Sequence, residues 1–263
     1  MTTSPEVPPT FRDTLRVVRA ANAGPFTLDG TRTYIVGRRR PAVVDPGPDR
    51  EPHVRAVLRE VADADAATLV VSHGHGDHAG AVTALAEGLE AHGVPYRVLG
   101  SGHPLAELPR EGEPIETDAG ALEPLSTPGH VPDHLAFHWS ERSALFVGDL
   151  LLGEGETTWV AGYPGCVSDY LDSLRRVGGL APAVIFPAHG PPLLDPARAV
   201  DRFEAHRRDR IAQVRGVLSE HPRAGEDEIV ERVYGDRVPP ELRRAALESV
   251  RALLDHVREN RNA

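Results

Sequence analysis

The segment SHGHGDHAG constrains this chain more than any other part of its sequence. It follows the apolar run ATLVV, which predicts a buried strand, and it leads into a predicted helix that runs to about residue 92. Within six positions it presents His73, His75, Asp77 and His78. An extended turn directs His73 and His75 at one ion, because they are two positions apart, whereas Asp77 and His78 point elsewhere and suit a second ion. A solvated histidine-rich turn or a helix cap is the alternative interpretation.

Three further candidate ligands each follow a later apolar run. His130 follows a strand and a Pro-Gly turn in STPGH, Asp149 ends LFVGD, and His189 stands after the strand in IFPAHG. Taken singly, each has an ordinary explanation as a turn, cap or loop residue. An unpaired carboxylate at the end of an apolar strand is costly, however. Together, five histidines and two aspartates at strand ends form a ligand set fit for two adjacent divalent ions.

Composition excludes several other kinds of site. All 29 basic residues are arginine, so a phosphate-binding, Schiff-base or general-base lysine is impossible. The single cysteine, Cys166, excludes an internal disulfide framework and a zinc cage built from cysteines. The formal net charge of −10 argues against a protein that binds polyanions through bulk positive charge.

The chain is long enough for one large domain, or a large domain and a small one. Short apolar strands and amphipathic helices fill its first part. Three helical stretches, at roughly 196–219, 225–234 and 240–259, follow a proline cluster near residue 194. We therefore expect a catalytic domain over 1–193 and a helical domain over 194–263. The sequence has no membrane-length apolar run and no signal-peptide pattern at its start, so we expect a cytoplasmic protein that does not contact membranes.

These motifs resemble the metallo-β-lactamase superfamily. VDPG, HGHGDH, TPGH, GD and AHG occur in the family's order and roughly its spacing over about residues 15–193. The resemblance implies an α/β fold, the αβ/βα four-layer sandwich. Carried over by position, it implies a first metal on His73, His75 and His130, a second on Asp77, His78 and His189, a bridging Asp149, and Asp45 orienting a ligand histidine from the outer shell.

A longer match points to the lactamase-β-2-like group. The segments STPGHVPDHLAFHWSERSALFVGDLLLGEGETTW and SDYLDSLRRVGGLAPAVIFPAHGPPLLDP resemble that group, and the C-terminal part resembles its small winged-helix-like domain, with the wing strands shortened or missing. In that group a DH pair follows TPGH, here Asp133 and His134. His134 either holds the leaving group of the substrate or the Asp77 side of the site, or it ties its loop to the backbone. A bridging aspartate is typical of the thioesterase and phosphodiesterase branches, whereas the β-lactam-hydrolysing branches lack it.

The resemblance therefore implies a dinuclear metal-dependent hydrolase. Two ions about 3.5–4 Å apart lower the pKa of a bridging water towards ~7, and the resulting metal-bound hydroxide attacks a carbonyl or phosphorus centre. Asp77 would orient this water or accept its proton, and His134 is the second candidate catalytic residue. Zn²⁺ is the expected metal, with Mn²⁺ and iron as alternatives. The first expected substrate is a thioester, small or carrier-bound, of the acyl-carrier or CoA type.

Three other functions stay open. A single-strand endoribonuclease or phosphodiesterase is the runner-up, although the net charge of −10 disfavours RNA and residues 201–263 hold 13 arginines against 13 acidic residues. A mononuclear iron persulfide dioxygenase uses part of the same ligand set, but seven filled ligand positions favour two metals. The third is a binding protein with a vestigial metal site. The C-terminal helices either cover the cleft or form an oligomer.

Overall fold

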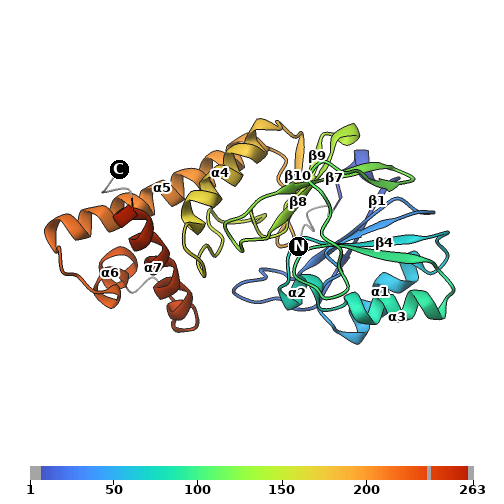
Figure 1. Ribbon diagram of the computed structural model, residues 1–263, viewed down its shortest axis with the longest axis horizontal. Coiled ribbons are helices and arrows are strands. Elements are labelled where there is room, and N and C mark those ends of the chain that lie inside the picture. The colour runs from blue at the N-terminus through green and yellow to red at the C-terminus, as the bar shows by residue number, and fades with distance from the viewer. Residues whose placement is uncertain (1–6, 236–237, 260–263) are drawn as a thin grey trace.

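The computed structural model describes residues 7–235 and 238–259. Two five-stranded sheets face each other, with helices on the outer side of each, and a group of helices extends from one end (Figure 1). Three apolar clusters hold these layers together. One fills the space between the sheets, and the other two lie between a sheet and its helices.

The first sheet has the strand order β1-β2-β3-β4-β5. Its strands β1, β2 and β3 pair antiparallel, whereas β3, β4 and β5 pair parallel. Apolar residues of α1 at three- and four-residue spacing, Val54, Val57 and Val61, pack on its outer face with α3. The elements of this half are η1 (Pro9–Phe11), β1 (Leu15–Arg19), β2 (Arg32–Val36), β3 (Ala42–Val44), α1 (Glu51–Val61), β4 (Ala67–Val71), α2 (Gly76–Ala79), α3 (Val82–Ala91) and β5 (Tyr96–Gly100).

The second sheet has the order β10-β9-β8-β7-β6, and only β9 and β10 pair parallel. Its buried strands alternate between two cores. Phe146 and Phe186 face the other sheet and stack 5.2 Å apart, whereas Leu145 and Ile185 face α4 and α5. The elements are β6 (Ile115–Thr117), β7 (Gly120–Ser126), β8 (Leu135–Trp139), η2 (Ser140–Arg142), β9 (Ala144–Phe146), α4 (Cys166–Gly179) and β10 (Val184–Phe186). The expected four-layer αβ/βα sandwich is confirmed.

The C-terminal part is helical, with α5 (Pro196–Glu220), α6 (Glu226–Tyr234), η4 (Pro240–Leu242) and α7 (Arg243–Glu259). The Asp195 side chain caps α5 by accepting the N–H of Arg198 at 3.2 Å. The long α5 leads away from the sandwich, and α6 and α7 pack against it (Figure 1). One apolar cluster runs from the outer face of the second sheet through α4 and α5 into α6 and α7. Within residues 196–235 and 238–259 there is no β-strand, and the winged-helix-like character of this part stays a prediction. The domain boundary near residue 194 stays a prediction.

The candidate site residues all follow strands that end at corresponding edges of the two sheets. β3 and β4 are parallel neighbours in the first sheet, and β7, β9 and β10 run in the same direction in the second. The predicted ligands lie in the loops after β7, β9 and β10 and in the turn and short helix α2 after β4, and Asp45 follows β3. None of the helices in the described residues has both the length and the apolar character needed to cross a bilayer.

Candidate metal centre

The structure brings all seven predicted metal ligands together in two adjoining groups. Within each group the candidate donor atoms lie within 4.8 Å of one another. The first group combines the turn after β4 with the loops after β7 and β9, and the second combines α2 with the loop after β10. The first group consists of His73, His75, His130 and Asp149, and the second of Asp77, His78 and His189.

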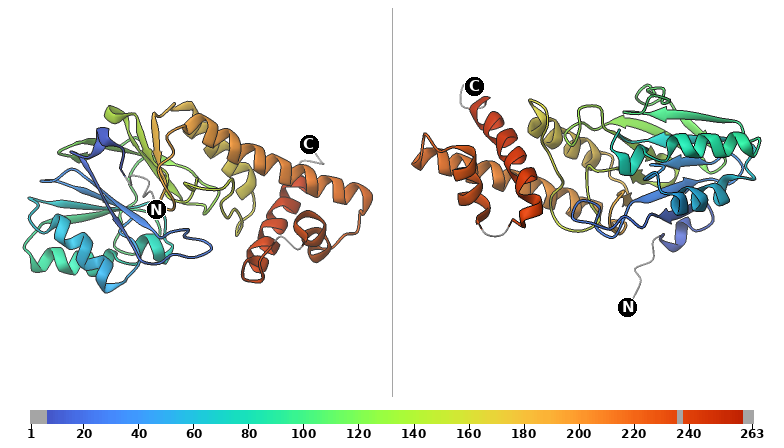
Figure 2. Two further views of the ribbon diagram at one scale, coloured as in Figure 1. Left: turned by 180° about the vertical axis from the view of Figure 1, so that it is seen from behind. Right: turned by 90° about the horizontal axis from the view of Figure 1, so that it is seen from below.

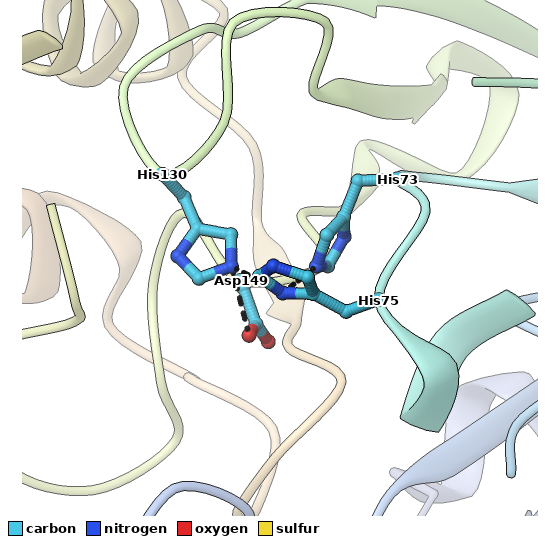
Figure 3. A group of neighbouring side chains, drawn as sticks. All are labelled: His73, His75, His130 and Asp149. Atoms are coloured by element: carbon cyan, nitrogen blue, oxygen red, sulfur yellow. Dashed lines mark hydrogen bonds and ion pairs between the residues drawn. The ribbon is translucent and has the colours of Figure 1, made fainter. Parts of the chain in front are cut away.

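Three imidazoles converge in the first group (Figure 3). Nε2 of His73 lies 2.9 Å from Nδ1 of His75, which in turn lies 3.0 Å from Nε2 of His130. Zinc–nitrogen bonds of 2.0–2.1 Å in a tetrahedron place ligand nitrogens roughly 3.3 Å apart. The three nitrogens are therefore almost at the separation that a shared ion requires.

Outward hydrogen bonds fix the orientation of the rings of His73 and His130. Nδ1 of His130 donates to the carbonyl oxygen of Trp159 at 2.8 Å. The hydroxyl of Ser72 donates to Asp45 at 3.0 Å and therefore accepts from Nδ1 of His73, also at 3.0 Å. With the proton on Nδ1, each ring directs the lone pair of Nε2 into the cluster.

Asp149 faces both groups at once. Its Oδ2 lies 3.5 Å from Nε2 of His130, while its Oδ1 lies 3.4 Å from Nε2 of His78 and 3.2 Å from Nε2 of His189. One carboxylate oxygen therefore belongs to each group. This is the arrangement that a bridging carboxylate needs, and it agrees with the role that the resemblance implies for Asp149.

The buried donor atoms of the second group fit a cation. Nε2 of His78, Nε2 of His189 and Oδ1 of Asp149 are buried and make no hydrogen bond in the described residues. Oδ2 of Asp77 adds a second carboxylate oxygen, 3.2 Å from Nε2 of His189. Leaving such atoms unsatisfied costs about 1–3 kcal/mol each, and a divalent ion satisfies all of them together. Nitrogen and carboxylate oxygen donors suit Zn²⁺, Mn²⁺ and iron.

The pKa shifts of His73, His130 and Asp149 favour their ligand-competent forms, whereas that of His78 favours its protonated form. Burial lowers the pKa of His73 well below its ordinary value and also lowers the pKa of His130, so both rings are neutral. Burial alone would raise the pKa of Asp149, but the neighbouring His78 and His189 hold it well below the usual range. Burial opposes protonation of His78, yet Asp149 and Asp45 raise its pKa well above normal. The carboxylates thus attract a positive charge at the place where an ion would displace the proton.

Asp45 lies behind the second group, where it holds His78. Its Oδ2 lies 3.0 Å from Nδ1 of His78, and its Oδ1 accepts the backbone N–H of Ser72 at 2.8 Å. Asp45 has the unusual φ of 49° and is buried. Such strain is maintained only where surrounding contacts compensate for it. These contacts agree with the outer-shell role that the resemblance implies for Asp45.

His134 is buried, and both of its ring nitrogens have partners within the protein. Nδ1 lies 2.8 Å from the hydroxyl of Thr127, and Nε2 accepts the backbone N–H of Asp149 at 3.2 Å. Burial lowers its pKa to about 3, so the ring is neutral. The neighbouring Gly148 has φ 47°, and a Cβ there would lie 2.7 Å from Nε2 of His134. Of the two interpretations of His134 from sequence, this geometry is that of a loop tie rather than of a substrate contact.

Two residues beside the cluster were not singled out from sequence. Ser72 links Asp45 to His73, and its place directly before the histidine-rich segment was a usable signal. Trp159 lies near two candidate ligands, with its ring 6.2 Å from that of His75 and 5.8 Å from that of His130. Trp159 lies in an irregular loop 29 residues beyond His130, so no sequence motif pointed to it.

Cys166 is buried, and burial raises the pKa of its thiol, so it is not acidified.

Comparison with known proteins agrees with this geometry. The model of the metallo-β-lactamase superfamily matches residues 27–189, which include Asp45 and every candidate ligand. The chain belongs to the metallo-β-lactamase superfamily. A metal-dependent hydrolase is the enzyme class that this membership and the clustered donors support.

Relatives and solved structures of the superfamily match nearly the whole chain. A beta-lactamase-like protein 2 homolog of Caenorhabditis elegans is 32% identical over 254 residues, covering 92% of this chain and 83% of the relative. An atrochrysone carboxyl ACP thioesterase of Aspergillus chevalieri is 31% identical over 270 residues, covering 93% and 81%. A beta-lactamase domain protein from Burkholderia ambifaria has the same fold, with a TM-score of 0.83, 22% identity, and coverage of 94% of this chain and 86% of its own.

Proposed function

We propose that this protein is a thioesterase that hydrolyses acyl thioesters of the acyl-carrier or CoA type with two divalent ions, Zn²⁺ first among them. The observation that supports the two-metal reaction is the placement of the two oxygens of Asp149, each facing a different donor group. The thioester is supported by the relatives. One that is 31% identical over 93% of this chain is named as an ACP thioesterase.

The two donor groups would each hold one ion. His73, His75 and His130 would hold the first, and Asp77, His78 and His189 the second, with Asp149 between them. When bound, such ions polarise a carbonyl oxygen and lower the pKa of water. The chain itself supplies a fixed frame, because Asp45, Ser72 and the Trp159 carbonyl hold the ligand rings from outside.

Asp77 is the residue best placed to handle the proton of the attacking water. Its side chain is 28% exposed and lines the cavity at the cluster, whereas its Oδ2 faces His189. Burial raises the pKa of Asp77, but the neighbouring His189 and the charge of His78 lower it by more, so the carboxyl group is ionised. Its second oxygen, Oδ1, would orient the water and accept its proton.

His134 would act as a positioning residue. By accepting the N–H of Asp149, it holds the backbone that carries the bridging carboxylate. The reaction needs no separate general acid for the leaving group, because an alkyl thiol is far more acidic than an alcohol and leaves readily as its thiolate. The proposed hydrolysis requires no serine or cysteine side chain as a nucleophile.

The test offers an acetyl-pantetheine thioester and a single-stranded RNA to the purified protein side by side, after its bound metals have been measured. Asp77→Ala is the diagnostic variant. The matched control is Asp172→Ala, which removes an exposed carboxylate on α4 that pairs with Arg175. We expect thioester cleavage by the wild type and by Asp172→Ala, a loss of at least about 10²-fold in Asp77→Ala, and intact RNA.

Other outcomes would change the proposal in defined ways. RNA cleavage that is lost in Asp77→Ala, without thioester cleavage, would replace the substrate and keep the site. One iron per chain with oxidation of a persulfide would replace the reaction. Equal activity in Asp77→Ala and the wild type would remove Asp77 from the mechanism.

A further inference from the structure

The candidate metal centre opens into a cavity of about 750 Å³. His75, Asp77, His130 and Asp149 form one part of its lining. Another part comes from α6, η4 and the first turns of α7, far along the chain. Helix α7 also packs against α4, which brings the C-terminal helices beside the sandwich (Figure 2). A substrate whose reacting carbon lies at the cluster therefore places one of its two substituents against these helices.

Both apolar and polar side chains line the C-terminal side of the cavity. The apolar ones are Val238, Leu242 and Ala246, joined by Leu152 from the loop after β9, and the polar ones are His206, Arg210, Arg244, Glu248 and Ser249. Leu152 and Val238 are partly buried and rest on the large cluster formed by α4 to α7, so the wall is backed by a packed core. A pocket of this size and lining is typical of sites that enclose most of an apolar ligand.

Aromatic side chains gather at the same cavity. Most aromatic residues of the chain lie in the core, but Phe26, Trp159 and Tyr234 line this space. Phe26 is 54% exposed, an unusual position for a side chain of this kind. The guanidinium of Arg210 lies over the ring of Tyr234 at 4.6 Å and donates to the carbonyl of Val233 at 3.3 Å, which fixes the plane of the tyrosine. Flat rings of this kind bind other rings by offset or edge-to-face contact.

We propose that this cavity binds the acyl group of the thioester, and that the group is bulky and bears a ring. This inference rests on the proposed thioesterase function and adds its substrate class. An acetyl group would leave most of 750 Å³ unfilled. A ring-bearing acyl group fills more of this volume and contacts Phe26, Trp159 and Tyr234, while the carrier arm stays at the mouth.

The experiment narrows the cavity from α7 and varies only the acyl group. Ala245 is half-buried and lines the cavity, so Ala245→Phe places a ring in the proposed acyl site. Ala252→Phe is the matched control, because Ala252 is a half-buried alanine on the same helix that packs against the core cluster. Acetyl-, benzoyl- and 2-naphthoyl-pantetheine share one thiol. Thermal melting of both variants establishes that they fold.

We expect the KM of the wild type to fall from the acetyl to the naphthoyl thioester. Ala245→Phe should raise the KM of the naphthoyl thioester by at least about tenfold and change the acetyl thioester by less than about twofold, whereas Ala252→Phe leaves the series unchanged. An equal loss for all three thioesters in Ala245→Phe would place the carrier arm in the cavity and overturn the inference. A wild type that prefers the acetyl thioester would also overturn it.

Binding of free 2-naphthoate separates this inference from the proposed function. The quenching of tryptophan fluorescence reports it without any turnover. Suppose that the wild type cleaves no thioester yet binds 2-naphthoate, and that Ala245→Phe weakens that binding by at least about tenfold. The proposed thioesterase reaction is then wrong, and the proposed ring-binding site is supported. If 2-naphthoate binds neither protein, the proposed ring-binding site is wrong.

Discussion

Nη2 of Arg207, on α5, donates to the carbonyl oxygen of Thr158 at 3.1 Å. Arg207 is buried, and its guanidinium also lies 5.2 Å from the ring of Tyr170. The residue after Thr158 is Trp159, whose carbonyl accepts the hydrogen bond from His130. A C-terminal helix thus holds the short segment that orients a candidate metal ligand.

Replacing Arg207 should therefore disturb the site as well as the fold. Arg207→Met keeps the apolar stem of the side chain but removes the guanidinium, so the carbonyl of Thr158 loses this donor and keeps only the hydroxyl of Thr157, at 3.2 Å. We expect the free energy of unfolding to fall by about 1–3 kcal/mol, the tryptophan emission to shift, and hydrolysis to weaken. Arg208→Met is the control. Its exposed guanidinium pairs with Glu204 one turn away, so its loss should cost less than about 0.5 kcal/mol. Equal effects of the two substitutions would contradict the link.

Asp45→Asn should weaken metal binding without unfolding the protein. Asparagine tolerates the positive φ of this position and retains an oxygen for the N–H of Ser72, but its uncharged amide no longer orients and polarises His78. We expect the affinity for one of the two ions to fall by about 10–100-fold, as measured by chelator competition. Asp49→Asn, an exposed carboxylate four residues on, should leave both affinities unchanged. Unchanged affinity in Asp45→Asn would show that the hydrogen bond to His78 is dispensable.

The strands, the ligands and the layer order could be predicted from sequence because their signals are local. An apolar run such as ATLVV has to be buried, and ligand-type residues directly after it lie at the edge of a sheet wherever that sheet packs. The same reasoning placed His130, Asp149 and His189. The family resemblance was needed to divide these residues between two ions. That division stays a prediction, with which the distances from the two oxygens of Asp149 to His130 and His189 agree.

Features that depend on distant contacts could not be predicted in this way. The sequence predicted one helix that runs to about residue 92, but the structure has two, α2 and α3. The helix is interrupted because the N–H of Ala81 donates to the carbonyl of Gly47, at 2.8 Å, instead of to a carbonyl of the preceding turn. Arg207 would pass for a solvated residue in an arginine-rich helix, yet it is buried against Tyr170. The cavity wall on α7 has no motif, since it exists only where the C-terminal helices meet the sandwich.

Metal removal should destabilise the protein, and the two ions should be separable. Chelation leaves buried donors unsatisfied and removes binding energy of about 2.7 kcal/mol when the free ion is at 100 times its Kd. Tm should fall by at least about 5 °C and recover with added metal. Elemental analysis should find two ions per chain in the wild type and one ion per chain in each of the variants His75→Ala and His189→Ala. The control variant His92→Ala, at an exposed position, should keep two ions. The loss of both ions in each single variant would show one cooperative site instead.

The contribution of the loop that carries Phe26 to the stability of the fold should depend on pH. Asp29 lies in this loop and accepts two hydrogen bonds from Arg32, at 2.7 and 2.8 Å, and one from Arg19 at 2.6 Å. The hydrogen bonds from Arg32, and less strongly that from Arg19, lower the pKa of Asp29 to about 2, against 3.8 for an ordinary aspartate. Because the folded pKa is the lower one, the carboxylate stabilises the fold fully above about pH 5, and the effect is lost as the pH falls through 3.8 towards 2.

Asp29→Asn should therefore lower the free energy of unfolding at pH 6 and make almost no difference at pH 2. The change at pH 6 should be about 1 kcal/mol or less, because the side chain is 40% exposed and water screens the pair. Urea unfolding of the wild type and the variant at a series of pH values measures this difference. Asp63→Asn, at an exposed position, should show no such trend. A difference between wild type and Asp29→Asn that persists unchanged at pH 2 would mean that the amide loses packing rather than charge, because a protonated Asp29 no longer pairs with Arg32.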